Sequence, residues 1–186
     1  MDNLIVDSYD YECVDDTEGS FKYDFVSLGE IEVPKRVLIQ RYPNPGLERY
    51  FNLGFGNIHI DDAGIEHISD MSRNNNKGDS DKVLKTVFTC VLDFLSIDSH
   101  SKSIITFYGN TSAKHRLYKK SLNKNLISIS KYFIIRGGVI QNLVTKENSG
   151  ESKQVLSKIN IETIKYEIYN TSNCNAYNFI TLELRQ

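Results

Sequence analysis

The sequence of 186 residues contains no tryptophan and only three cysteines, Cys13, Cys90 and Cys174. These cysteines lie far apart, and no two of them form a Cys-x-x-Cys pair. A disulfide-stapled scaffold and a structural zinc site both need more cysteines at closer spacing, so the sequence excludes these two classes. A small, odd number of separated cysteines is typical of a protein in a reducing compartment.

Long apolar runs are also missing. The N-terminus has no basic region followed by an apolar run, so we expect no signal peptide. The most apolar stretch, residues 83–95, is interrupted by Lys85 and Asp93 and is too short to cross a bilayer. We therefore expect a cytoplasmic protein that has no membrane partner.

Several signatures of catalysis and cofactor binding are absent as well. The chain has no Walker loop, no G-x-S-x-G segment and no glycine pattern of a dinucleotide-binding fold. We therefore expect no cofactor. His59 and Asp61 would point to the same side of an extended segment and are the best candidates for a divalent metal. Because no recognised ligand spacing surrounds them, we expect no metal.

Acidic residues are absent from residues 99–146, a stretch of 48 residues. The whole chain has 22 basic and 24 acidic residues, but residues 1–33 hold ten acidic and one basic residue, a net charge of −9. Residues 34–186 hold 21 basic and 14 acidic residues, a net charge of +7, so the total of −2 does not exclude an anionic partner. The basic residues of the acid-free stretch are Lys102, Lys114, Arg116, Lys119, Lys120, Lys124, Lys131, Arg136 and Lys146.

The order of the predicted elements indicates an α+β fold. The composition, with 40% hydrophobic and 25% charged residues, is that of a globular protein. Hydrophobic periodicity predicts helices over residues 80–95, capped by Asp79 or Ser80, and over residues 111–129. It predicts strands over residues 21–26, 33–42, 49–60, 103–109, 132–136, 161–169 and 177–184.

We expect one domain over residues 21–186, with a mixed, mostly antiparallel sheet and two main helices. An acidic arm over residues 1–20 precedes it, residues 61–77 form a polar loop, and Gly137-Gly138 stop a strand. The succession of elements also occurs in the ribonuclease-H-like fold, so that strand order is a further possibility. An active two-metal nuclease is disfavoured, because Asn110 stands where such an enzyme needs an acid.

The second predicted helix and the turn before it form the candidate site. Free N–H groups and the positive end of the helix dipole meet there, so Thr111 and Ser112 would help to bind a phosphate or carboxylate. Gly109 would let the partner approach the backbone, and Tyr118 would stack on a base. Positive charge would come from Lys114, Arg116, Lys119 and Lys120. The last three are expected to face solvent, with Ala113, Leu117, Ser121 and Leu122 on the inward side.

These residues predict a non-catalytic module that binds an anionic partner, in the first place a nucleic acid or a phosphate group. Two other functions stay open. One is a protein-interaction component of a toxin–antitoxin or phage-defence system, and the other is an enzyme that acts on a nucleotide or phosphoester with His115 as acid or base. A purely structural interpretation is that the acidic arm neutralises the basic helix within the molecule. The sequence leaves the oligomeric state open.

Three segments occur in a familiar order: Tyr50-Phe-Asn-Leu-Gly-Phe-Gly-Asn57, Asn76-Lys-Gly-Asp-Ser-Asp-Lys-Val-Leu-Lys-Thr-Val87, and Gly109-Asn-Thr-Ser-Ala-Lys-His-Arg-Leu-Tyr118. Over residues 20–140 the chain resembles a bacterial family of small α+β proteins known only as a domain of unknown function. Lys114 stands where that family tends to have arginine, and Asn110 where a small hydroxyl is usual. The resemblance implies a bacterial or mobile-element origin, and it makes residues 109–118 the most characteristic segment. It brings no known activity that could be carried over to this chain.

Overall fold

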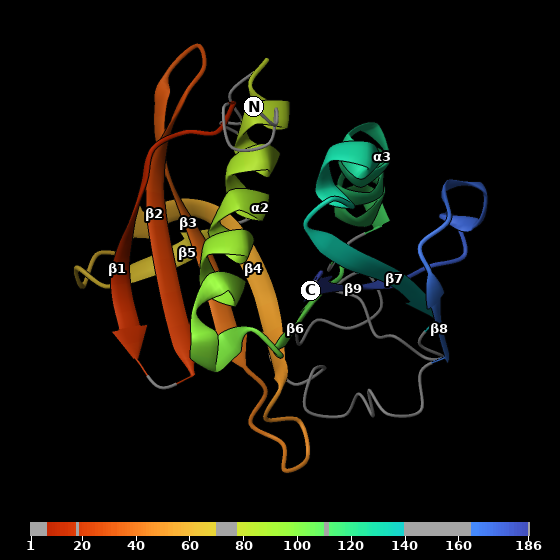
Figure 1. Cartoon of the computed structure of the whole chain (residues 1–186). Coiled ribbons are helices and arrows are strands. Elements are labelled where there is room, and N and C mark those ends of the chain that lie inside the picture. The colour runs from red at the N-terminus through yellow and green to blue at the C-terminus, as the bar shows by residue number, and fades with distance from the viewer. Residues whose placement is uncertain (1–6, 18, 70–77, 110–111, 140–164, 186) are drawn as a thin grey trace. The chain divides into compact units, whose positions relative to one another are not determined.

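The computed structural model of the chain describes residues 7–17, 19–69, 78–109, 112–139 and 165–185. Nine strands and two α-helices lie in these residues, which confirms the predicted α+β class (Figure 1). The chain divides into two compact units: residues 1–41 with 52–101 (unit 1), and residues 42–51 with 102–186 (unit 2). No helix in the described residues is long and apolar enough to span a membrane. The single domain predicted over residues 21–186 stays a prediction.

Unit 1 is built on a sheet whose main strands follow the order of the chain. They are β1 (Tyr11–Thr17), β2 (Ser20–Leu28), β3 (Glu32–Arg41) and most of β4 (Tyr50–Ile60), with β5 (Glu66–Ser69) paired to β4. β2 and β3 form an antiparallel ladder without a register shift. Because side chains alternate across a strand, Phe21, Tyr23 and Phe25 share one side of β2, and all three are buried.

Helix α2 (Ser80–Ser96) packs on the buried side of this sheet (Figure 1). Apolar residues recur at three- and four-residue steps along it, so Val87, Val91 and Leu95 form one buried stripe. The Phe94 ring lies 4.8 Å from the Phe21 ring between centroids. The helix predicted from periodicity is therefore confirmed, and η1 (Asp98–His100) follows it.

Two predictions for unit 1 are corrected. The acidic arm predicted over residues 1–20 is part of the sheet over residues 11–17, because these residues form β1 and pair antiparallel with β2. A bulge between Cys13 and Asp15 interrupts the alternation of side chains, which explains why the sequence shows weak periodicity there. The predicted polar loop over residues 61–77 contains β5, a strand of four residues that is too short and exposed to leave a hydrophobic pattern.

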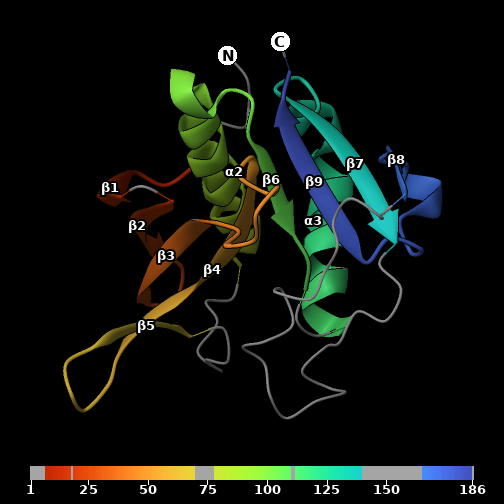
Figure 2. The same cartoon turned by 90° about the horizontal axis from the view of Figure 1, so that it is seen from below.

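Unit 2 contains a split β-α-β motif. Strand β6 (Ile104–Phe107), helix α3 (Ser112–Ile129) and β7 (Phe133–Val139) follow one another in the chain. Strand β9 (Phe179–Leu184) lies between β6 and β7 and is antiparallel to both, so these two strands are parallel to each other (Figure 2). Strand β8 (Lys165–Ile168) pairs with the other edge of β7, and η4 (Thr171–Asn173) precedes β9.

This order of strands corrects two further predictions. In the ribonuclease-H-like order the strands on either side of the second helix are direct neighbours, whereas here β9, which comes from the end of the chain, separates them. Gly137 and Gly138 do not stop β7, since both pair with β8 and β9. The ring of Tyr177 covers Gly137 so closely that a Cβ atom there would lie 2.4 Å from the ring. The glycine therefore makes room for an aromatic ring and does not end the strand.

Candidate functional site: the outer face of helix α3

Helix α3 turns one side inward in unit 2. Lys119, Leu122 and Ile129 are buried and His115 is half-buried, and these residues recur at steps of three, four and seven. Phe107 of β6 adds an aromatic contact on the same side, because its ring lies 6.4 Å from the Tyr118 ring. This buried stripe determines which residues the helix leaves on its outside.

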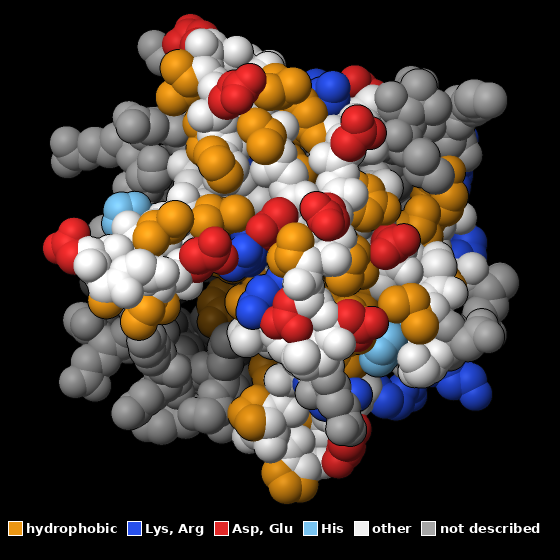
Figure 3. Space-filling model, turned by 90° about the vertical axis from the view of Figure 1, so that its left-hand side faces the viewer, with side chains coloured by type: hydrophobic (Ala, Val, Ile, Leu, Met, Phe, Trp, Pro, Cys, Tyr) orange, Lys and Arg blue, Asp and Glu red, His pale blue; other side chains and the backbone are white. Residues whose placement is uncertain are grey.

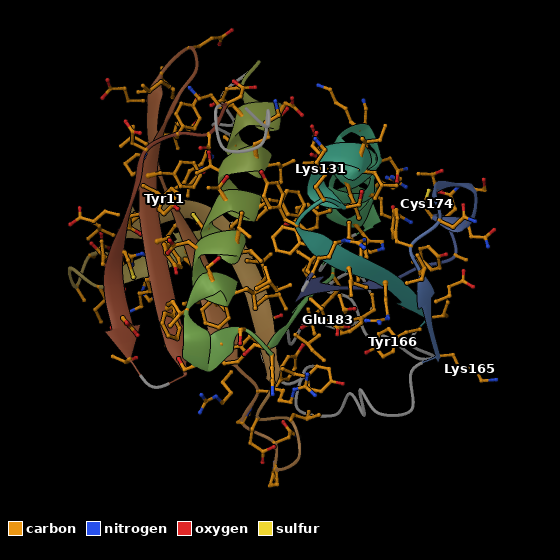
Figure 4. The ribbon with its side chains drawn as sticks, in the orientation of Figure 1. Tyr11, Lys131, Lys165, Tyr166, Cys174 and Glu183 are labelled. Atoms are coloured by element: carbon orange, nitrogen blue, oxygen red, sulfur yellow. The ribbon has the colours of Figure 1, made fainter. Side chains whose placement is uncertain are left out.

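The outer face of α3 consists of five exposed residues, Arg116, Leu117, Lys120, Lys124 and Ile127. At 3.6 residues per turn they lie within an arc of about 100°. Leu117 is 47% exposed and Ile127 is 82% exposed. In the described part of the chain, no ion pair involves Arg116 or Lys120. Lys131, just beyond the helix, is exposed too (Figure 4). The outer face is therefore cationic and includes two large apolar side chains.

The predicted orientation of α3 was wrong at two positions. Lys119 was expected beside Arg116 and Lys120 in solvent, but it is only 7% exposed, and its Nζ lies 3.4 Å from the backbone oxygen of Tyr177. Leu117 was expected to face inward but is exposed. The long methylene stem of a lysine can follow an apolar surface, so Lys119 fits the buried stripe between His115 and Leu122.

The turn before α3 is closed by packing in its described part. The Gly109 N–H donates to Nδ1 of His115 at 3.2 Å, and a Cβ atom on Gly109 would lie 2.2 Å from the backbone nitrogen of His115. The missing side chain of Gly109 therefore leaves room for helix α3. The space beside its backbone, where a partner was expected to approach, is occupied by His115. Thr111 and the side chains of Ser112 and Lys114 lie outside the described residues, so their predicted roles stay predictions.

His115 has both ring nitrogens engaged. Nδ1 accepts from Gly109, and Nε2 lies 2.7 Å from the backbone oxygen of Tyr177, to which it donates. These two bonds require the neutral tautomer with its proton on Nε2. Burial lowers the pKa of His115, and the charge of Lys119 lowers it further, although the bond to Tyr177 raises it. The geometry therefore assigns His115 a structural role and leaves no free nitrogen for acid–base chemistry.

We expect acid to destabilise the fold through this histidine. Because the pKa of folded His115 lies below its ordinary 6.5, the unfolded chain takes up the proton first, and stability is lost as pH falls below 6.5. The free energy of unfolding, measured by urea titration, should decrease by up to about 1.4 kcal/mol per pH unit for this group. His115→Gln should remove the contribution of this histidine to the pH dependence of the free energy of unfolding. Burial also lowers the pKa of His100, and its contribution remains in this variant. An unchanged slope in His115→Gln would contradict the structural role.

Tyr118 is half-buried, and its ring contacts Phe107 edge to face. The same contact that holds α3 on β6 thus occupies the ring that was expected to stack on a base. The stacking of Tyr118 on a base stays a prediction.

The suggested metal pair, His59 and Asp61, lies in the hairpin between β4 and β5. Oδ2 of Asp61 is 2.7 Å from Nε2 of His67, and its Oδ1 accepts the backbone N–H groups of Ala63 and Ile65. These hydrogen bonds lower the pKa of Asp61 and use its carboxylate to close the turn. The described residues contain no group of three or more potential ligands placed for a metal.

All three cysteines are free thiols. Cys13 is exposed and Cys90 is buried in α2, where burial raises the pKa of its thiol. Cys174, half-buried after η4 (Figure 4), accepts from Nδ2 of Asn123 at 3.4 Å. The absence of a disulfide was predicted from the spacing of the cysteines.

A second polar cluster, which we did not predict from the sequence, lies in unit 1 at the start of α2. Asp79 occupies the N-cap position but makes no side-chain capping bond. Its Oδ2 instead accepts from the hydroxyls of Ser27, at 2.5 Å, and Tyr9, at 3.0 Å. Lys35, 7% exposed, donates to Oδ1 of Asn57 at 2.7 Å. Burial lowers the pKa of Lys35, and the charge of Asp79 opposes this effect.

This cluster holds α2 on the sheet. Its acceptors face donors in the same unit, so the arrangement is that of a satisfied structural network. A signal for Lys35 was present in the sequence: it shares the two-residue period of the buried residues Val33, Val37 and Ile39. Alternation along β3 therefore places this lysine on the buried side.

The acidic N-terminal segment has partners within unit 1. Asp7 pairs with Lys85 at 2.5 Å, and Asp15 pairs with Lys22 at 2.7 Å between nitrogen and oxygen. Arg36 joins Asp24 and Glu66 in a further network. The predicted neutralisation of α3 by the acidic segment stays a prediction.

The chain was compared with models of protein families. The model described as a family of unknown function (DUF6934) matches residues 6–158, which is more than half of the chain. The comparisons with curated proteins and with solved structures give no match.

Proposed function

We propose that this chain, which belongs to the family of unknown function DUF6934, binds an anionic partner through the outer face of α3. The first candidate is the phosphate backbone of a nucleic acid. The observation that carries the proposal is the exposure of Arg116 and Lys120 on one side of a helix, within 48 residues that contain no acid. A cationic surface attracts polyanions regardless of their base sequence.

The contact set differs from the one expected from sequence. Arg116, Lys120 and Lys124 would supply the charge, with a rise of about 6 Å along the helix between successive members. Arg116 can bind a phosphate through two parallel N–H···O bonds, whereas the lysines act as point charges. Lys119, His115 and Tyr118 support this face from within.

Salt dependence tests the proposal. If three cations each neutralise one phosphate of a single strand, the logarithm of the binding constant should fall with a slope of about −2 against the logarithm of salt concentration. A fourfold rise in salt should therefore weaken binding roughly 20-fold. Fluorescence anisotropy of a labelled oligonucleotide measures this directly. Absence of binding at low salt, or binding that salt does not change, would refute a phosphate-backbone contact.

A protein partner is the second candidate, as in the toxin–antitoxin or phage-defence role considered above. The observation in its favour is the exposure of Leu117 and Ile127 among the cations. Phosphate backbones offer no apolar surface, whereas protein interfaces combine apolar centres with charged rims. A partner protein that remains bound at high salt, with little retention of DNA or RNA, would favour this candidate.

The enzyme alternative has less support. It required a titrating His115, and both nitrogens of that ring are bonded within unit 2.

A further inference from the structure

The turn that joins β2 to β3 has the opposite character to the outer face of α3. Leu28 and Ile31 are 57% and 54% exposed there, and Glu30 and Glu32 beside them are exposed as well. In the described part of the chain, neither glutamate takes part in an ion pair. We call these four residues the acidic hairpin tip.

Acidic and hydrophobic side chains continue from this tip along the sheet. Val26 of β2 is exposed on the side of the sheet that α2 does not cover. Figure 3 views the side on which β1 and β2 lie in Figure 1, and acidic and hydrophobic side chains gather on it, with basic side chains among the acidic ones near its centre. Exposed apolar side chains that lie in groups are typical of interaction surfaces, whereas single ones are common on any protein surface.

We propose that the acidic hairpin tip of one copy of this chain docks on the outer face of α3 of a second copy. The two surfaces are complementary in both respects that matter for an interface. Each presents two large exposed apolar side chains, Leu28 and Ile31 on one and Leu117 and Ile127 on the other. Glu30 and Glu32 offer two negative charges to Arg116 and Lys120, for which the described part of the chain provides no ion pair. The apolar side chains would form the centre of the contact and the ion pairs its rim.

A second copy is favoured over an unrelated partner because both halves of the contact are present in this one sequence. The proposal rests on the proposed function, since it assigns the anionic partner of the α3 face. The two surfaces differ from each other, so the contact is heterologous. It gives a closed dimer when two such contacts form reciprocally, and a larger assembly when they do not.

The contact should depend on salt, because its rim is solvent-exposed. Raising salt from about 0.05 to about 0.5 M should increase the dissociation constant of self-association about tenfold or more. Reversal of the charges on one side of the rim should abolish the contact. Each ion pair would then become a pair of like charges, which repel each other.

Sedimentation velocity over a concentration series tests the proposal with two charge-reversed chains. Glu30→Lys/Glu32→Lys and Arg116→Glu/Lys120→Glu should each stay monomeric where the wild type associates. An equimolar mixture should associate again, because the reversed tip matches the reversed helix and the two unchanged surfaces match each other. Asp10→Lys/Asp62→Lys, which makes the same charge change at two other exposed acids, should behave like the wild type.

A wild type that stays monomeric at low salt, or a mixture that fails to associate, would overturn the proposal. Polyanion binding is judged separately, with a Glu30→Gln/Glu32→Gln chain, which removes the negative charges of the tip without adding cations and keeps the α3 face intact. If this chain binds an oligonucleotide while the wild type never self-associates, the proposed function stands and only the second-copy partner is wrong. If the charge-reversed mixture associates while no chain binds a polyanion, the second-copy contact stands and nucleic acid is excluded.

Discussion

Replacement of Gly109 by alanine should destabilise unit 2 by about 3 kcal/mol, near the upper end of overpacking effects. The new Cβ atom would lie 2.2 Å from the backbone nitrogen and 2.5 Å from the Cα atom of His115. Backbone atoms in the first turns of a helix cannot rotate away as a flexible side chain can. The helix must therefore shift outward, and the bonds of His115 to Gly109 and to Tyr177 break with that shift.

Urea unfolding followed by circular dichroism measures this loss. Gly54→Ala is the matched control, because a Cβ atom on Gly54 would meet nothing within 4 Å. We expect the control to change the free energy of unfolding by less than about 0.5 kcal/mol. Equal stability of the Gly109→Ala and Gly54→Ala proteins would contradict the close approach of α3 to Gly109.

The local elements of this fold follow from the sequence where one face of an element is apolar. The stripe of Val87, Val91 and Leu95 is sufficient to predict α2, and the alternation of Phe21, Tyr23 and Phe25 predicts β2. β1 was missed because its bulge breaks the alternation, and because it carries acidic residues at the edge of a sheet. The position of β9 between β6 and β7 depends on a segment from the end of the chain, which local patterns do not encode.

The exposure of residues on α3 was predicted correctly at some positions and wrongly at others, and their role in binding stays a prediction. The absence of acids over residues 99–146 pointed to α3, and Arg116 and Lys120 are exposed as expected. The side of α3 that faces the core was predicted wrongly. Lys119 was expected in solvent because of its charge, but it lies on the same buried stripe as Leu122 and Ile129. Charge alone does not determine exposure when a long stem can lie along apolar neighbours and its ammonium reaches a carbonyl.

Reversal of two charges on the outer face of α3 should nearly abolish binding of a polyanion. Each lysine or arginine near an anionic surface contributes about 1 kcal/mol, and a glutamate in its place adds repulsion. Arg116→Glu/Lys120→Glu should therefore weaken the binding of an oligonucleotide roughly 100-fold or more at low salt. Both residues are exposed, so the substitutions should leave the free energy of unfolding within about 0.5 kcal/mol of the wild type.

The dissociation constant of a single-stranded oligonucleotide, compared between two double variants at one low salt concentration, tests the central claim most directly. Lys102→Glu/Lys165→Glu changes the net charge by the same amount at two exposed residues that are not part of α3. If the outer face of α3 is the binding surface, this control stays within about threefold of the wild type, since distant charges are largely screened. Arg116→Glu/Lys120→Glu loses binding. Equal weakening in both variants would show that only the net charge matters. An oligonucleotide that the wild type does not bind, at a protein concentration where the chain is monomeric, would contradict the account.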